Sequence, residues 1–168
     1  MKKKIFAFLL VILVCLSVIS CDKDKEEKAE SNPTKDQEQV STIKGEQYEA
    51  TDFVMTIAEG YAKLDIDGGV QAYKGNDMIE VWARGFNNTE TDAKNGAENL
   101  SKTYKGTEPQ KVNKFGIDFY TTDIEAMSRP QTIYVGIYKG KKVQIAISGN
   151  DYKNNTLLQG MFNSLAFK

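Results

Sequence analysis

The feature that most constrains the fold is a strict alternation of apolar residues between residues 131 and 148. Two runs alternate on either side of a turn at Lys139-Gly140-Lys141: first Ile133, Val135 and Ile137, then Val143, Ile145 and Ile147. A period of two places successive side chains on opposite faces of a strand. The pattern therefore predicts an antiparallel hairpin with one face in the core.

Strands and two helices account for the rest of the C-terminal part. Further strands are predicted over 53–57, 61–66, 70–73, 78–84, 110–114 and 115–122. A helix is predicted from Thr89, which can cap it, to a stop at Gly106, with its apolar stripe at Ala93, Ala97, Leu100 and Tyr104. Residues 149–151 can cap a final helix that carries Leu157, Leu158, Met161, Phe162 and Leu165. This order predicts an α+β sandwich, a mainly antiparallel sheet packed by a central helix and a C-terminal helix.

The N-terminus has the pattern of a bacterial lipoprotein signal peptide. Lys2, Lys3 and Lys4 precede an apolar run over 5–14 that is too short to cross a bilayer as a stable helix. The run leads to Val18-Ile19-Ser20-Cys21, which resembles a lipobox. We therefore expect residues 1–21 to be a signal peptide that ends in a lipidated Cys21. Acyl chains such as palmitate on Cys21 would anchor the chain at the extracytoplasmic face of the cell membrane.

A charged segment follows the cysteine. Residues 22–49 contain few apolar side chains and no periodicity, which predicts a disordered tether, and residues 50–168 form the predicted α+β domain. Residues 51–168 hold 14 basic and 14 acidic side chains, and the two signs are interleaved. A neutral domain lacks the positive field that drives nucleic-acid binding, so no nucleic-acid partner is expected.

The composition also narrows the possible chemistry. The chain contains no histidine, and its two cysteines, Cys15 and Cys21, both lie in the signal region. This removes the common general base, Cys and Ser–His nucleophile pairs, and thiolate or imidazole zinc sites from the mature domain. We therefore expect no catalytic residues, no metal site and no cofactor.

Two acidic patterns suggest a site but also have a structural explanation. Asp65-Ile66-Asp67-Gly68-Gly69 resembles part of a calcium loop but lacks the remaining ligands, which favours a turn between strands. Asp118, Asp123 and Glu125 could supply the carboxylate pair of a glycosidase, although nothing in their spacing makes them converge, and solvated acids are the favoured interpretation.

Aromatic and basic residues offer binding surfaces. A stacking surface could be formed by Trp82 and by Tyr48, Tyr61, Tyr73, Tyr120, Tyr134, Tyr138 and Tyr152. Tyr134 and Tyr138 share one face of their strand and are the candidate binding residues, although packing in the core or under a helix is the favoured interpretation. The turn at 139–142 contains three lysines and could contact anionic lipid or wall polymer, although a solvated hairpin tip is the usual reason for such a turn.

Three short motifs carry a resemblance to a known family. They are Glu59-Gly60-Tyr61 after the first strand, Tyr134-Val135-Gly136-Ile137-Tyr138 in the hairpin with the loop Ser148-Gly149-Asn150-Asp151 after it, and Asn163-Ser164-Leu165-Ala166-Phe167 at the end. Over about residues 50–168 the chain resembles the Mog1/PsbP-like group, which includes bacterial lipoproteins of the LpqN kind. The family pattern has Pro and Trp where this chain has Ala58 and Tyr61. The resemblance implies a binding or assembly-accessory role, with no catalytic residues to carry over.

The expected function is thus that of a non-enzymatic, membrane-anchored module that binds an envelope protein or polymer. A carrier of a small ligand or lipid, and a carboxylate-dependent hydrolase, are the alternatives.

Overall fold

The computed structural model describes residues 43–168. Ten strands and two helices follow one another in this part of the chain. They are β1 (Gly45–Glu49), β2 (Phe53–Ala58), β3 (Ala62–Ile66), β4 (Gly69–Lys74), β5 (Asp77–Arg84), α1 (Glu90–Tyr104), β6 (Gln110–Lys114), β7 (Ile117–Ala126), β8 (Arg129–Tyr138), β9 (Lys141–Ser148), α2 (Thr156–Asn163) and β10 (Ala166–Phe167).

The strands form two antiparallel sheets. The larger has seven strands in the order β3-β4-β5-β9-β8-β7-β6, and the smaller has three in the order β1-β2-β10. Every neighbouring pair is antiparallel, from the β1–β2 hairpin to the β8–β9 hairpin. The predicted α+β class with a mainly antiparallel sheet is confirmed.

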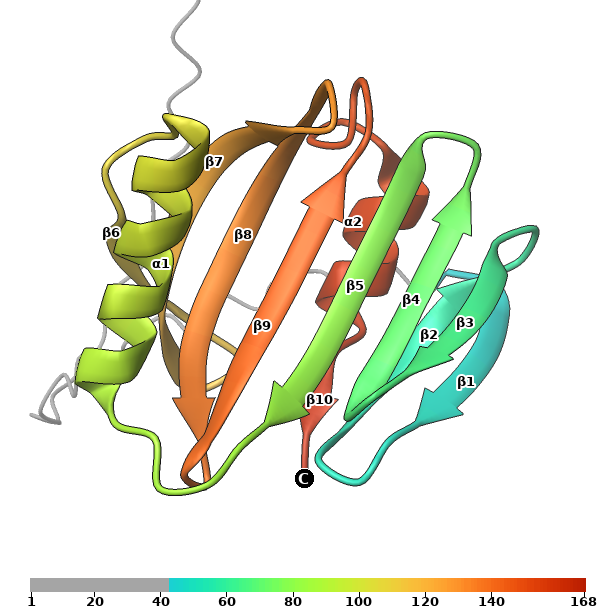
Figure 1. Cartoon of the computed structure of the whole chain (residues 1–168). Helices are drawn as coiled ribbons and strands as arrows, with labels where there is room; N and C mark the ends of the chain where they lie inside the picture. The colour runs from blue at the N-terminus through green and yellow to red at the C-terminus, as the bar shows by residue number, and fades with distance from the viewer. Residues whose placement is uncertain (1–42) are drawn as a thin grey trace, which may run out of the picture. The chain divides into compact units, whose positions relative to one another are not determined.

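The helices lie on opposite faces of the large sheet (Figure 1). On the near face in that view, α1 packs on β7 and β8. On the far face, α2 packs on β2 and β5. Two apolar cores result: the larger includes Phe53, Phe119 and Leu158, and the smaller, under α1, includes Ala97 and Val135. The near face of β3, β4 and β5 carries no helix (Figure 1).

The β8–β9 hairpin departs from the expectation that only one of its faces is core. Its turn has two residues, Lys139 and Gly140, both at positive φ, so Tyr138 pairs with Lys141 and Tyr134 with Ile145. This register places Ile145 on the face that carries Tyr134 and puts Ile133 on the other. Both faces are therefore covered, one by α1 and the other by the larger core.

The start of α1 follows the predicted cap. The Asp92 carboxylate accepts hydrogen bonds from the backbone N–H of Thr89 at 2.7 Å and from its hydroxyl at 2.8 Å. The helix ends at Lys105 in the left-handed region, with φ 53°, and not at Gly106 as expected. Gly106 is needed for a different reason, because a Cβ there would lie 2.5 Å from the carbonyl oxygen of Asp123.

The ends of later elements differ from the sequence pattern by several residues. The Asn155 side chain caps α2 by accepting hydrogen bonds from the N–H groups of Leu157 and Leu158, whereas residues 149–154 form turns. β7 runs on to Ala126, and the turn to β8 is made by Met127 and Ser128 before Pro130 pairs with Glu125. Neither helix between residues 43 and 168 is long and apolar enough to cross a membrane.

The folded part begins earlier than residue 50. β1 lies inside the segment expected to be a tether and pairs with β2 along its whole length, from Gly45 opposite Ala58 to Glu49 opposite Val54. Partial burial of Tyr48 against the larger core, and a 3.1 Å hydrogen bond from its hydroxyl to the Gly69 carbonyl, attach the strand further. Residues 1–42, with the predicted signal peptide, Cys21 and most of the tether, lie outside the described residues.

Candidate functional site

The three candidate carboxylates do not converge. Along β7 the even positions face α1 and the odd positions face the larger core, as the buried side chains of Ile124 and Phe119 show. Asp118 therefore lies on one face of the sheet, and Asp123 and Glu125 on the other. The five residues from Asp118 to Asp123 also span roughly 16 Å of strand. Asp118 therefore cannot form a glycosidase pair with Asp123 or Glu125. Asp123 and Glu125 share a face, but the Asp123 carboxylate is already bound by Thr132 and Lys153.

Asp118 belongs to an exposed network on the α1 side. Lys111 Nζ lies 2.7 Å from Glu90 Oε1 and 3.1 Å from Asp118 Oδ2, and the Tyr120 hydroxyl donates to Glu90 at 2.8 Å. Hydrogen bonds from Lys111 and Tyr120 lower the pKa of Glu90, and the hydrogen bonds of Lys111 to Glu90 and Asp118 raise the pKa of Lys111 above its usual value. Because these side chains are exposed and satisfy one another, the network is an ordinary surface feature.

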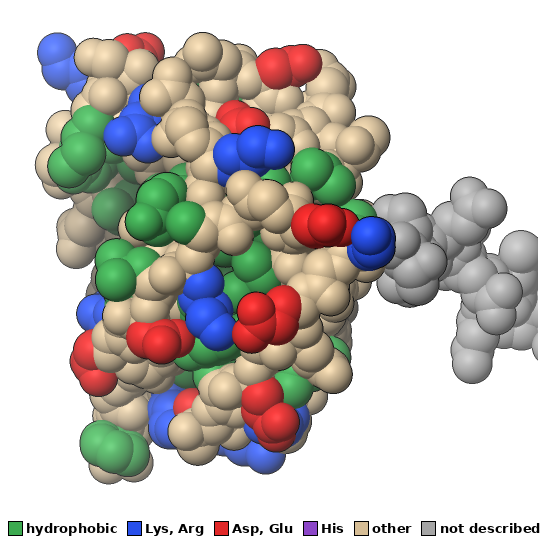
Figure 2. All heavy atoms as spheres, turned by 90° about the vertical axis from the view of Figure 1, so that its right-hand side faces the viewer, with side chains coloured by type: hydrophobic (Ala, Val, Ile, Leu, Met, Phe, Trp, Pro, Cys, Tyr) green, Lys and Arg blue, Asp and Glu red, His purple; other side chains and the backbone are tan. Residues whose placement is uncertain are grey.

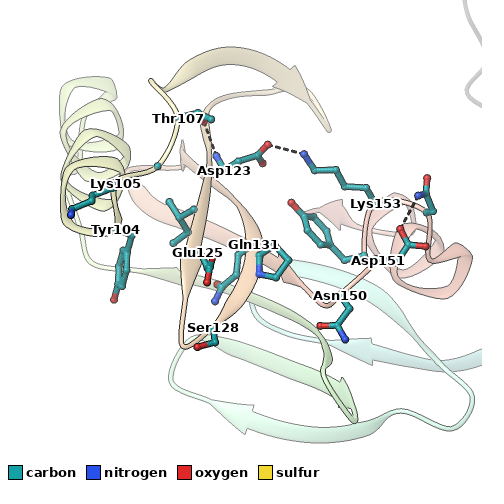
Figure 3. A pocket seen from close by; sticks show the side chains of 15 residues that line it. Tyr104, Lys105, Thr107, Asp123, Glu125, Ser128, Gln131, Asn150, Asp151 and Lys153 are labelled. Atoms are coloured by element: carbon teal, nitrogen blue, oxygen red, sulfur yellow. Dashed lines mark hydrogen bonds and ion pairs between the residues drawn. The ribbon is translucent and has the colours of Figure 1, made fainter.

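Asp123 lies at a polar depression of about 930 Å³ (Figure 3). Its carboxylate accepts hydrogen bonds from the Thr132 hydroxyl at 2.5 Å and from Lys153 at 2.7 Å, and its backbone N–H donates to Thr107 Oγ1 at 2.9 Å. The Tyr152 hydroxyl is 2.7 Å from that of Thr132. Burial alone would raise the pKa of Asp123, but the hydrogen bonds from Lys153 and Thr132 outweigh it and hold the pKa below its usual value.

The polar groups around Asp123 are therefore paired among themselves. Figure 3 shows Lys153 pointing to Asp123, away from Glu125 and Ser128 on the far side of the depression. The cluster joins the segment before α2 to β7 and β8.

Residues 65–69 form the expected turn. Asp67 and Gly68 connect β3 to β4, and Arg84 Nε donates to the Asp67 carbonyl oxygen at 2.6 Å. Among residues 43–168, no three or more acidic side chains come together as metal ligands would.

Tyr134 and Tyr138 have internal packing partners. The Tyr134 ring stacks on Phe162 of α2 at 5.1 Å between centroids, and it meets Phe119 edge-on at 6.1 Å. The Tyr138 ring lies 5.2 Å from Phe167, and its hydroxyl donates to the Lys168 carbonyl oxygen. This placement corresponds to the packing alternative and does not present the two rings as exposed anchors. Whether either contributes to binding stays a prediction.

The remaining aromatic and basic candidates do not form one platform. Tyr120 and Tyr152 take part in the two polar clusters described above, and the Arg84 guanidinium covers the Trp82 ring at 4.8 Å. At the 139–142 turn, Lys141 forms a 2.7 Å ion pair with Asp52, and Lys139 donates to the Lys168 carbonyl.

A second hollow, which the sequence did not predict, has a different character. We call it the sheet groove: a volume of about 640 Å³ over the near face of the large sheet, beside the C-terminal half of α1. Five large hydrophobic side chains are exposed in residues 43–168, namely Leu64 (51%), Tyr73 (41%), Phe86 (85%), Tyr104 (43%) and Met127 (90%). All except Phe86 line the groove.

Figure 2 shows hydrophobic side chains at the surface among charges of both signs on the β1 and β3 side of the molecule.

The floor of the groove mixes apolar and polar groups. Met78, Ile133 and Ala146 supply the apolar part, and Gln71, Gln131 and Gln144 supply amides. Ser148 also lines the floor; its side chain is fully buried, and its Oγ has no hydrogen-bond partner among the described residues. An unpaired buried hydroxyl costs about 1–3 kcal/mol. Such a group indicates a place where a bound molecule could supply the missing partner.

One acid and one base stand at different places in the groove. Gln71 Nε2 donates to the Glu80 carboxylate at 3.0 Å and Trp82 Nε1 donates to it at 3.2 Å, while no ion pair joins Glu80 to a cation in the part of the chain described. Arg129 at the start of β8 likewise has no acidic partner there. One feature of the sequence indicates this surface. Met78 and Trp82 are apolar, although they lie on the face of β5 opposite its buried Ile79 and Val81.

The comparisons with known proteins bear on the fold. No protein-family model matches the sequence, and no significantly similar sequence was found among curated proteins. The solution structure of cyanobacterial PsbP (CyanoP) from Synechocystis sp. PCC 6803 matches 73% of this chain and 92% of its own, with a TM-score of 0.54 and 14% identity. A crystal structure from Bacteroides thetaiotaomicron VPI-5482 matches with a TM-score of 0.52 and 10% identity, over 75% of this chain and about half (49%) of its own. At these identities the likeness shows the fold alone: the described domain has the α+β fold of CyanoP.

Proposed function

We propose that the chain is a non-enzymatic binding module that holds a partner in the sheet groove. The observation that carries the proposal is that four of the five exposed large hydrophobic side chains of residues 43–168 line this one groove. Single exposed hydrophobic residues are ordinary on protein surfaces, but the gathering of several around one groove favours an interaction site. The unpaired hydroxyl of Ser148 in the floor adds a polar contact point.

The chemistry of the domain supports binding over turnover. Residues 22–168 contain no histidine or cysteine, and Asp118 lies on the opposite face of the sheet from Asp123 and Glu125. The carboxylates of Asp118 and Asp123 are both engaged in hydrogen bonds. The resemblance of the sequence to the Mog1/PsbP-like group implies an accessory role, and the fold shared with CyanoP is compatible with that role.

We further propose that the module is anchored to the extracytoplasmic face of the cell membrane through acylated Cys21. The basic start, the short apolar run and the lipobox-like Val18-Ile19-Ser20-Cys21 support this part of the proposal. Replacing Cys21 by Ala should abolish acyl labelling of the full chain and release it from the membrane fraction. Labelling that persists would contradict the anchor, because Cys15 is the only other thiol.

The groove is tested by placing a photo-reactive amino acid at Tyr73 or at Met127 of the full chain in its native cells. Irradiation should give the same specific adduct from both positions. Phe86 is the matched control, because it is an exposed hydrophobic residue outside the groove. Equal adduct formation from Phe86, or no specific adduct from either groove position, would overturn the proposed function.

A further inference from the structure

We infer that the occupant of the sheet groove is an extended segment of another polypeptide, with a basic residue near Glu80 and an acidic residue near Arg129. This inference rests on the proposed function and names the partner's chemistry. Its support comes from the length of the groove, the composition of its floor and the placement of its two charges.

The groove is long and open. Its lining runs from Leu64 on β3, across β4, β5, β9 and β8, to Ile124 on β7. With strands about 4.8 Å apart, five steps across the sheet cover roughly 24 Å. An extended peptide covers that length with about seven residues, whereas a compact small molecule would fill only part of it.

The floor suits a polypeptide backbone. Gln71 and Gln131 already donate hydrogen bonds within the domain, the first to Glu80 and the second to the Ala126 carbonyl, while the Ser148 hydroxyl has no partner among residues 43–168. Apolar residues separate these polar groups. A peptide offers N–H and C=O groups in alternation with side chains, so it can satisfy both kinds of surface.

The two charges favour a partner that carries both signs. In the register of β5, β9 and β8, Glu80 lies opposite Ala146 and Ile133, and Arg129 is four residues further along β8. Two strand spacings and four residues separate their Cα atoms by roughly 16 Å. A basic and an acidic residue about five positions apart in an extended peptide would match this separation.

Other classes of partner fit the same surface less well. A lipid chain would bury the charges of Glu80 and Arg129 without an ionic partner for either. A polyanionic polymer would place negative charge against Glu80. A neutral glycan could hydrogen-bond Glu80 and Arg129 through its hydroxyls, but it carries no charge to pair with either.

The test identifies the adduct that forms from the two ends of the groove. A photo-reactive residue at Leu64 and another at Met127, each in the full chain, should attach to one polypeptide at sites within about ten residues of each other. Mass spectrometry should find a basic residue toward the Leu64 site and an acidic residue toward the Met127 site. An adduct that is a glycan or a lipid, or two sites far apart in the partner's sequence, would overturn the inference while leaving the groove as a binding site. The absence of any groove-specific adduct would overturn the proposed function as well.

A charge exchange with the identified segment gives the second measurement. A synthetic peptide of that segment should bind the full chain, and Glu80→Gln or Arg129→Gln should each weaken binding about two- to fivefold. Glu80→Lys should weaken it further, and a peptide whose basic residue is replaced by Glu should restore binding to that variant. Glu108→Gln is the matched control, because Glu108 is an exposed acid outside the groove and should change nothing. Failure of the exchanged peptide to restore binding would contradict the assigned contact.

Discussion

The hydroxyls of Thr132 and Tyr152 lie 2.7 Å apart, and the Thr132 hydroxyl donates its hydrogen to Asp123 Oδ1 at 2.5 Å. Since that hydrogen is used, Tyr152 must be the donor to Thr132. Both residues are buried, so this chain of hydrogen bonds ends in the interior on the Tyr152 side and at a half-exposed carboxylate on the other. It holds the loop before α2 against β7 and β8.

Asp123 should make the stability of the domain depend on acid. Its folded pKa is lower than its unfolded value of about 4. The carboxylate therefore stabilises the fold fully above that value, and the contribution is lost as the pH falls through the lower, folded pKa. Chemical denaturation between pH 6 and pH 2 should show the free energy of unfolding falling in the acid range, and Asp123→Asn should flatten part of that fall.

Other acids contribute in the same window, because the pKa of Glu90 and that of Asp118 are also lowered by hydrogen bonds. Thr132→Val, which removes a donor to Asp123, should therefore flatten the acid slope in the same direction as Asp123→Asn. If neither variant changes the slope, the hydrogen bonds do not set the proton affinity of this carboxyl.

Tyr134 should be mainly a packing residue. Its ring is half-buried between Phe119 and Phe162, so Tyr134→Ala should lower the free energy of unfolding by about 2 kcal/mol or more. Tyr134→Phe keeps the ring and should be nearly neutral, since no hydrogen bond of the Tyr134 hydroxyl is present in the described part of the chain. Denaturant titration distinguishes the two variants. If Tyr134→Ala leaves the free energy of unfolding unchanged but abolishes binding of the partner polypeptide, Tyr134 is a binding residue and not mainly a packing residue.

The sequence predicted the fold class because most of its signals are local. Alternation identified the β8–β9 hairpin, and the Thr89 cap with the Ala93 and Ala97 stripe identified α1; the structure confirms each. The pattern predicts a single core face, which is wrong, because the two-residue turn pairs an even residue with an odd one and the two apolar runs point to opposite sides. β1 was missed because its exposed, polar residues resemble the tether, and only pairing with β2 makes it a strand.

The groove could not be predicted from the sequence, because its lining residues are far apart in the chain. Its lining comes from α1 and from six strands, and its two rim residues Leu64 and Met127 are 63 positions apart in the chain. Nothing local distinguishes Leu64 or Tyr73 from ordinary strand residues. That Ser148 lacks a hydrogen-bond partner is likewise a property of the packed sheet and not of the sequence.

Ser148 should be a position where stability and binding oppose each other. Its Oγ is buried without a partner, so Ser148→Ala should raise the free energy of unfolding of the unliganded chain by up to about 1–2 kcal/mol. If a bound partner satisfies the hydroxyl, the same change should lower adduct formation from Tyr73. Thermal unfolding and photo-cross-linking, measured on the same variant, test the two halves separately. A destabilised Ser148→Ala variant would mean that the hydroxyl has an internal role.

The turn between β7 and β8 should also lower the stability of the domain while placing a side chain in contact with the partner. Met127 and Ser128 both have positive φ, 53° and 57°, a conformation that turns of this kind normally assign to Asn or Gly. Ser128→Gly relieves the backbone and keeps the exposed methionine, so it should raise the free energy of unfolding by about 1 kcal/mol and leave adduct formation from Tyr73 unchanged. Met127→Asn should stabilise the turn to a similar degree but remove an apolar side chain from the groove rim, and adduct formation from Tyr73 should fall. Denaturant titration and cross-linking of the two single variants separate these effects.

Equal cross-linking by both variants would show that Met127 does not touch the partner. A loss of cross-linking with Ser128→Gly alone would show that the backbone of the turn, and not the methionine side chain, shapes the groove.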